Sequence, residues 1–321
     1  MMKLLPETNI DFVGKRFIFF GISTVLLAIS FISVAVKGPN LGLDFTGGTM
    51  LQLKFEAPVQ IGQLRDALDK AGIKPDIQSF DNNSFAIRLK GKQEKVNEVG
   101  DQITKAITDA LPEAKFSKER VEYVGPAVGR DLSKKAIWAL VLAMFGIIIY
   151  LAFRFNNPLW GTAGVVGIFH DVLITVGLLS VTNRQIDLII VAALLTIAGY
   201  SINDTIVIFD RMRENIRLNI RMPIRDVINK SMNETLSRTI ITSLTVFMAS
   251  MTLFLFGGDV INDFAFAMVI GTIIGVYSTI GVATPLLYQW SGEKNTHSAQ
   301  AEDKPAQESA DRPARKKHRR A

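Results

Sequence analysis

The residues best suited to chemistry interrupt a stretch that is otherwise long and apolar enough to cross a lipid bilayer. Tyr200, Ser201, Asn203 and Asp204 stand inside the apolar run of residues 186–209. A carboxylate inside a membrane is costly unless it is protonated, paired or hydrated, so its presence there indicates function. On a helix, Tyr200 and Ser201 share a face with Asp204. We therefore expect Asp204 to take part in ion binding; a polar cluster at a helix end is the plainer alternative.

A second polar pair, His170 and Asp171, lies near the middle of another apolar run, residues 161–181. The pair could relay protons, but a structural pair whose members satisfy each other is favoured. The other histidines lie in a polar tail, so a histidine metal site is not expected. The chain has no cysteine, which excludes disulfides and cysteine-bound metals. No cofactor is expected.

Composition places the chain in the membrane class. Of its 321 residues 48% are apolar, and the mean hydropathy of +0.25 is high for a soluble protein of this size. The net charge of +6 is compatible with nucleic-acid binding. However, the basic residues gather in particular loops, as expected from membrane topology, so no nucleic-acid partner is predicted.

Six apolar runs approach the ~20 residues that a bilayer core requires. They cover residues 17–37, 136–153, 161–181, 186–209, 239–256 and 264–290, the last five forming a membrane domain over 135–290. The loop between the fourth and fifth runs holds Arg211, Arg213, Arg217, Arg221, Arg225 and Lys230, with Arg238 at its end. The short loops on the other side hold only Arg184. Because cytoplasmic loops are enriched in Lys and Arg, we expect residues 1–16 and both termini in the cytoplasm, and residues 38–134 outside.

Residues 291–321 form a polar tail that ends in a cluster of Arg and Lys. Their composition predicts disorder. Such a cluster could bind anionic lipid, and a solvated tail that only sets topology is the simpler alternative.

The external segment has the pattern of a small α+β domain. From about Thr49 to residue 134, alternating and helical hydrophobic patterns predict the order βαββαβ, which is typical of the ferredoxin-like fold. The segment shows neither a nucleophile next to a base nor a phosphate-binding loop. We therefore predict a binding or mechanical module and not an enzyme.

Turn residues mark both ends of this domain. Gly47 and Gly48 permit positive φ in a tight turn, and Asp44 is expected to accept a hydrogen bond within its own turn. At the other end Gly125 and Pro126 make a corner. That corner is equally compatible with a hinge and with a plain linker.

Several strings together give the chain a family resemblance. They are LGLDFTGGT at 41–49, VEYVGPAVG at 121–129, FRF at 153–155, HDV at 170–172, GYSINDTIVIFDRMREN at 199–215 and LSRTIITS at 236–243. In these strings the chain resembles the SecF family, membrane subunits of the bacterial protein-export machinery that are related to the RND transporters. The resemblance runs from about Asp11 to Gln289.

The resemblance implies a polytopic α-helical protein of the inner membrane, with six spans (an RND-like half) and a ferredoxin-like periplasmic domain after the first. It also implies a complex with a separate SecD chain beside the SecYEG channel, with YajC, the SecA-dependent machinery and an unfolded preprotein as further partners. Some family members fuse SecD and SecF, whereas this chain carries six spans. The other half of a pump would then come from a second polypeptide.

In the family the Asp of the GYSxND string and the Arg of the LSRT string belong to the ion-coupling site; here they are Asp204 and Arg238. Ser201 and Asn203, with His170 and Asp171, are second-rank candidates. The implied function is ion-driven completion of export with SecD after the ATP-dependent SecA step, with H⁺ or Na⁺ as the ion. The alternatives are an RND-type exporter of small solutes or lipids, and a purely structural subunit.

Overall fold

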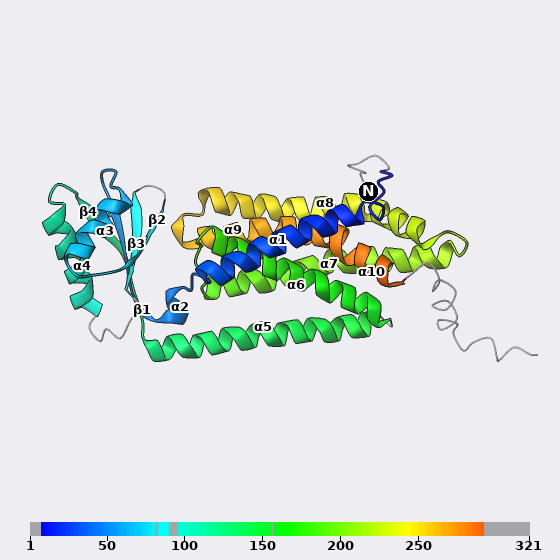
Figure 1. Ribbon diagram of the computed structural model, residues 1–321, viewed down its shortest axis with the longest axis horizontal. Helices are drawn as coiled ribbons and strands as arrows, with labels where there is room; N and C mark the ends of the chain where they lie inside the picture. Colours follow the sequence, from blue (N-terminus) through cyan, green and yellow to red (C-terminus); the bar gives the residue numbers. More distant parts are fainter. Residues whose placement is uncertain (1–7, 81–82, 90–95, 156, 292–321) are drawn as a thin grey trace, which may run out of the picture.

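The protein consists of a long bundle of helices and a small unit of strands and helices beyond one end of it (Figure 1). The computed structural model describes residues 8–80, 83–89, 96–155 and 157–291. Within these ranges six helices are long and apolar enough to cross a membrane. They are α1 (Arg16–Lys37), α5 (Pro126–Arg154), α6 (Pro158–Val181), α7 (Leu188–Leu218), α8 (Ile224–Phe256) and a last one made of α9 (Asp259–Ser278), η1 (Thr279–Ala283) and α10 (Thr284–Ser291). The predicted six-span membrane protein is confirmed. The predicted basic tail lies outside the described residues after Ser291.

Several helices run further than the apolar runs that predict them. Helix α5 begins at Pro126 and not at residue 136, α7 continues to Leu218, and α8 begins at Ile224 and not at residue 239. Hydropathy detects only the apolar part of such a helix, whereas the helix itself continues through polar residues that hydropathy does not mark. Proline at the first helical position starts both α5 and α6.

The small unit is a four-stranded sheet with two helices on one face. Its elements are β1 (Gly48–Phe55), α3 (Ile61–Lys70), β2 (Asp76–Ser79), β3 (Ser84–Leu89), α4 (Val96–Ala110) and β4 (Phe116–Val124). The strands pair in the order β2-β3-β1-β4, and every pair is antiparallel. Alternate residues of β1, such as Leu51 and Leu53, meet Leu64 of α3 and Ile103 of α4 in a core of their own. The element order is the predicted one; assignment to the ferredoxin-like fold stays a prediction.

The sheet is joined to the bundle through the two neighbouring strands β1 and β4. A short helix, α2 (Leu43–Thr46), leads into β1, while β4 runs straight into α5. Gly47 and Gly48 have φ of +65° and +133°, the values that favour glycine. A Cβ on Gly129 of α5 would lie 3.1 Å from the Gly47 nitrogen, so the two segments touch backbone to backbone. Gly125 and Pro126 stand directly at the start of α5.

The hydrogen-bond partner of Asp44 differs from the predicted one. Its carboxylate accepts a hydrogen bond from the Leu188 N–H, at 3.1 Å, at the beginning of α7. The first N–H groups of a helix have no partner within the helix and attract a carboxylate. Asp44 therefore binds the beginning of α7, which is distant in sequence, and not the N–H groups of its own turn. Asp44 therefore ties the entrance of the small unit to α7.

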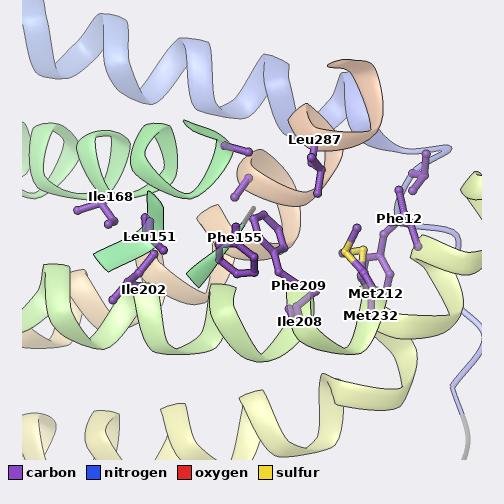
Figure 2. Packing of buried hydrophobic residues seen from close by; sticks show 14 of the residues in the cluster. Phe12, Leu151, Phe155, Ile168, Ile202, Ile208, Phe209, Met212, Met232 and Leu287 are labelled. Atoms are coloured by element: carbon purple, nitrogen blue, oxygen red, sulfur yellow. The ribbon is translucent and has the colours of Figure 1, made fainter. Parts of the chain in front are cut away.

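The main core of the bundle lies at the end away from the sheet. There Phe155 packs edge-on against Phe209, with ring centroids 5.7 Å apart. Phe12, from the segment before α1, reaches into the same core beside Met212 and Met232 (Figure 2). Buried residues are concentrated in α6, α7 and the last span, whereas α1, α5 and α8 are mostly exposed.

Candidate functional site

Asp204 is buried on α7 with little to satisfy it. Asp204 is 4% exposed. Ser243 of α8 donates a long hydrogen bond of 3.4 Å to Asp204 Oδ2, and Tyr200 donates to Ser243 Oγ at 2.9 Å. On the same face of α8, Thr239 is fully buried, and its hydroxyl has no partner among the described residues. The α7–α8 interface therefore holds a carboxylate and polar groups that do not saturate it.

Arg238 lies near Asp204 but does not pair with it. Among the described residues no ion pair joins the two, and the Arg238 charge acts on the carboxylate from a longer distance. The reason is helical phase. Five residues separate Arg238 from Ser243, which places their side chains ~140° apart around α8. Ser243 faces α7, and Arg238 is exposed.

Asn203 points away from this interface. It is exposed, and it shares one face of α7 with Ala192, Thr196 and Gly199, which are exposed as well. Their spacing of three and four residues makes a continuous stripe. Small residues at such spacing allow another helix to approach closely in a membrane.

Asp171 is the hub of a second cluster, with 0% exposure. Its Oδ1 lies 3.1 Å from His170 Nδ1. Its Oδ2 accepts hydrogen bonds from Ser201 of α7 at 2.5 Å and from Ser278 of α9 at 2.8 Å. The structure thus brings three of the four second-rank candidates together, with Asn203 apart from them. The predicted His170–Asp171 pair is a member of a larger network and is not confined to itself.

The network continues into α1. Ser23 lies 3.1 Å from His170 Nε2 and 2.9 Å from the Tyr277 hydroxyl, which donates to the Phe19 carbonyl at 2.6 Å. Neither Ser23 nor Tyr277 was a candidate from the sequence. The buried residues of α1 are Ser23, Ser30 and Ser33 in an otherwise apolar helix, and that stripe is the signal that could have found Ser23.

A π-helix begins directly after Ser278. It covers Thr279–Ala283, and the Thr279 hydroxyl lies 2.9 Å from that of Thr205 on α7. π-Helical turns are rare and often occur at functional sites. Residues 200–205 of α7 therefore contact α6, α8 and the last span from successive positions.

No metal or cofactor site emerges from this geometry: in the ranges that the structure describes, no three His, Asp or Glu side chains come close enough to hold a metal ion. The chemistry available is the exchange of a proton or monovalent cation at a buried carboxylate.

Comparison with known proteins places this geometry in a family. Residues 102–293 match the model for the C-terminal part of the protein export membrane proteins SecD and SecF, and residues 32–59 match the SecD/SecF GG motif. The chain belongs to the SecF family. The GG-motif match includes Asp44, Gly47 and Gly48.

Individual SecF proteins resemble the chain over most of its length. It is 43% identical to the protein translocase subunit SecF of Endomicrobium trichonymphae, over 92% of this chain and 95% of the relative. It is 47% identical to the SecF of Calditerrivibrio nitroreducens, over 88% and 94%. The crystal structure of SecDF from Thermus thermophilus, a translocon-associated membrane protein, matches with a TM-score of 0.80 at 34% identity. That match covers 89% of this chain and 39% of the SecDF chain.

Proposed function

We propose that this chain is the SecF half of an ion-driven accessory complex of the Sec translocase, with SecD as a separate subunit. The names of its relatives and its likeness to part of the SecDF chain support a role in protein export. The chain spans 39% of that SecDF chain, and in the proposal SecD supplies the remaining part as a separate polypeptide. SecYEG, YajC and the SecA-dependent machinery belong to the proposal through family membership.

The proposed topology places the sheet outside the cytoplasmic membrane and both chain ends in the cytoplasm. The Arg-rich end of α7 and the beginning of α8 lie at the end of the bundle opposite the sheet (Figure 1). Positive residues favour the cytoplasmic side of a membrane. The start of α1 lies at that same end (Figure 1).

The observation that carries the proposed mechanism is the incomplete environment of Asp204. A buried carboxylate that has only a long hydrogen bond from Ser243 and a contact with Thr242, both from α8, is poorly stabilised in its charged form. It stands one residue from the exposed stripe that ends at Asn203. An exposed Asn inside a membrane span is unfavourable, and a helix of SecD packed on this stripe would cover it. The site of ion coupling is then shared between the two subunits.

In this mechanism ion entry neutralises Asp204 and weakens its attraction to Ser243 and Arg238, so that α7 and α8 repack. The Asp44 contact with the start of α7 and the close approach of Gly47 to Gly129 connect such a movement to the sheet. The sheet unit would hold the emerging preprotein after the SecA step and prevent it from sliding back. A membrane potential supplies about 2.3 kcal/mol per charge per 100 mV, which is enough to bias a two-state switch.

The test is export of a reporter protein into inverted membrane vesicles with and without an uncoupler. With the wild-type chain, export should slow when the uncoupler is added. With Asp204→Asn, which keeps the size and hydrogen-bonding capacity, export should be slow already and indifferent to the uncoupler.

Asp210→Asn is the matched control, because Asp210 lies on the same helix and is paired with Arg154 at the far end of the bundle. Its vesicles should stay sensitive to the uncoupler. Uncoupler-sensitive export with Asp204→Asn would refute the mechanism and favour a structural role for the chain.

A further inference from the structure

A short segment ahead of α1 is pinned along α8 by an ordered set of polar contacts. We call residues 9–14 the N-terminal strap and Arg225, Asn229 and Asn233 the ladder. The ladder residues are four apart, so they lie on one face of α8. Asn233 binds the strap backbone twice: the Ile10 N–H donates to its Oδ1, and its Nδ2 donates to the Ile10 carbonyl, both at 2.9 Å.

The next two ladder residues hold Asp11 and Val13. Asn229 accepts from the Val13 N–H at 3.0 Å and donates to Asp11 Oδ1 at 2.8 Å. Arg225 forms an ion pair with Asp11 Oδ2 at 2.5 Å. A side chain on Gly14 would collide with this ion pair, since its Cβ would meet both Asp11 and Arg225. The strap therefore binds the ladder through Ile10, Asp11 and Val13, and Gly14 leaves room for the ion pair.

The strap is also anchored by apolar burial. Phe12 and Val13 are buried in the main core, beside Met212 of α7 and Met232 of α8 (Figure 2). Its polar edge forms one wall of a cavity of about 780 Å³, whose other walls come from α7 and α8. The strap thus combines a buried apolar anchor with a polar edge that the ladder binds.

The strap continues into α1 without a flexible linker. A hydrogen-bonded turn, with Lys15 N–H donating to the Phe12 carbonyl at 3.1 Å, leads into the helix at Arg16. Further along α1, Ser23 contacts His170 and so reaches the Asp171 network. A displacement of the strap would therefore also displace Ser23.

Helix α8 connects the ladder to the proposed ion site at Asp204. Helix α8 is continuous from Ile224 to Phe256, and it carries the ladder, then Arg238 and then Ser243. Arg238 lies five residues after Asn233, about 7.5 Å along the axis. Across from the strap, Glu234 accepts from Arg211 at 2.6 Å and from Asn215 at 2.7 Å. The extension of α8 is consequently held between the strap and α7, one turn before Arg238.

We propose that the strap and its ladder are a permanent tie that makes α1 and α8 move as one body and so positions Arg238 for ion coupling. Asp11, Arg225, Asn229 and Asn233 are positioning residues in this device. Through it a shift of α8 at Asp204 reaches the His170–Asp171 pair from the opposite side. The inference rests on the proposed function, because Arg238 has this role only if Asp204 carries the ion.

The ionised state of the Asp11 carboxylate favours a contact between strap and ladder that stays formed. The hydrogen bond from the Gly14 N–H, together with the contacts to Asn229 and Arg225, holds the pKa of Asp11 below its usual value. A carboxylate with a lowered pKa loses its contribution to stability only when the pH falls through that pKa. The Asp11 carboxylate therefore stays charged, and able to pair with Arg225, at neutral pH.

The first test measures the distance between α1 and α8 and needs no export assay. The chain has no cysteine, so single spin labels can be placed at Phe17→Cys on α1 and Lys230→Cys on α8. Pulsed EPR on the purified full chain should give one narrow distance. Breaking the ladder with Asn229→Ala and Asn233→Ala should broaden that distribution, whereas Asp226→Asn, exposed on the same helix and outside the ladder, should leave it narrow. An unchanged width in the ladder variant would overturn the proposal.

The second test switches the tie in protein that is already folded. Asp11→Cys with Asn229→Cys removes the central contacts, and a short bis-methanethiosulfonate linker restores the connection until a reductant cleaves it. Uncoupler-sensitive export should be near wild type with the linker and at least threefold slower after reduction. The cysteine-free wild type treated in the same way is the control.

Each outcome of the second test decides the question. A purely structural role would leave export unchanged by reduction, and a strap that must detach would be blocked by the linker; either result contradicts the proposal. If wild-type export itself ignores the uncoupler, the proposed function fails, and the EPR distances alone judge the tie.

Discussion

Asp171 and Asp204 are both buried carboxylates on membrane-spanning helices, and their surroundings are opposite. Asp171 has partners for both oxygens, in His170, Ser201 and Ser278. Asp204 accepts a long hydrogen bond from Ser243, has a further contact with Thr242, and stands beside an exposed stripe. A saturated carboxylate is complete within the chain and holds helices together. An unsaturated one is available to an ion or to a partner, and on the proposed mechanism this difference separates a structural carboxylate from the ion-coupling one.

The largest expected effect tests the structural side of this contrast. Asp171→Ala removes the hydrogen-bond partner of the Ser201 hydroxyl and one of the two partners of Ser278 and of His170, and an unpaired buried group costs about 1–3 kcal/mol. We expect a loss of at least ~3 kcal/mol, visible as poor accumulation in membranes and a lower melting temperature in detergent. Asp204→Ala, the matched change, removes one long bond and should cost less than ~1 kcal/mol. Equal destabilisation by the two changes would contradict the proposed difference between Asp171 and Asp204.

A smaller effect concerns how Arg238 acts on Asp204. Because the two groups are not in contact, Arg238 should act through charge alone, so Arg238→Lys should keep uncoupler-sensitive export and Arg238→Gln should lose it. Residues that act as a unit show coupling of about 0.5–3 kcal/mol, so Arg238→Gln with Asp204→Asn should be no slower than either single variant. Loss of activity with Arg238→Lys would point instead to a bidentate contact.

The smallest effect concerns the exposed stripe. Asn203→Leu should weaken association with the SecD partner by about 0.6–2 kcal/mol, the range of a hydrogen bond between membrane helices. Co-purification of tagged SecD at increasing detergent would measure it. Leu244→Ala, an exposed apolar position on α8, is the control and should retain the partner. Equal retention by both variants would remove the stripe from the interface.

Patterns along the chain were sufficient for the architecture. Six spans follow from runs of apolar residues, and the order of strands and helices in the small unit follows from its periodicity. The helix ends could not be predicted in the same way, because α8 changes from polar to apolar without leaving the helix. Asp44 also required the fold, since its partner Leu188 lies far along the chain.

The site was only partly predictable for a similar reason. Intramembrane polarity singled out Asp204, Asp171 and Ser201, but Ser201 serves Asp171 and not its neighbour Asp204. That assignment depends on how α6 and α7 are rotated against each other. The strap was missed because it is short, and its contacts are made to side chains more than two hundred residues away.

The π-helical turn at Thr279–Ala283 sets the rotation of everything that follows it. Its five residues occupy roughly the place of one α-helical turn, so one residue is extra, and each residue of a helix advances the rotation by ~100°. Leu287 is 1% exposed and faces the main core (Figure 2). In an uninterrupted α-helix the same leucine would face about a quarter-turn away. The last span is thus assembled from two helical phases, one registered to Asp171 through Ser278 and the other to the apolar core through Leu287.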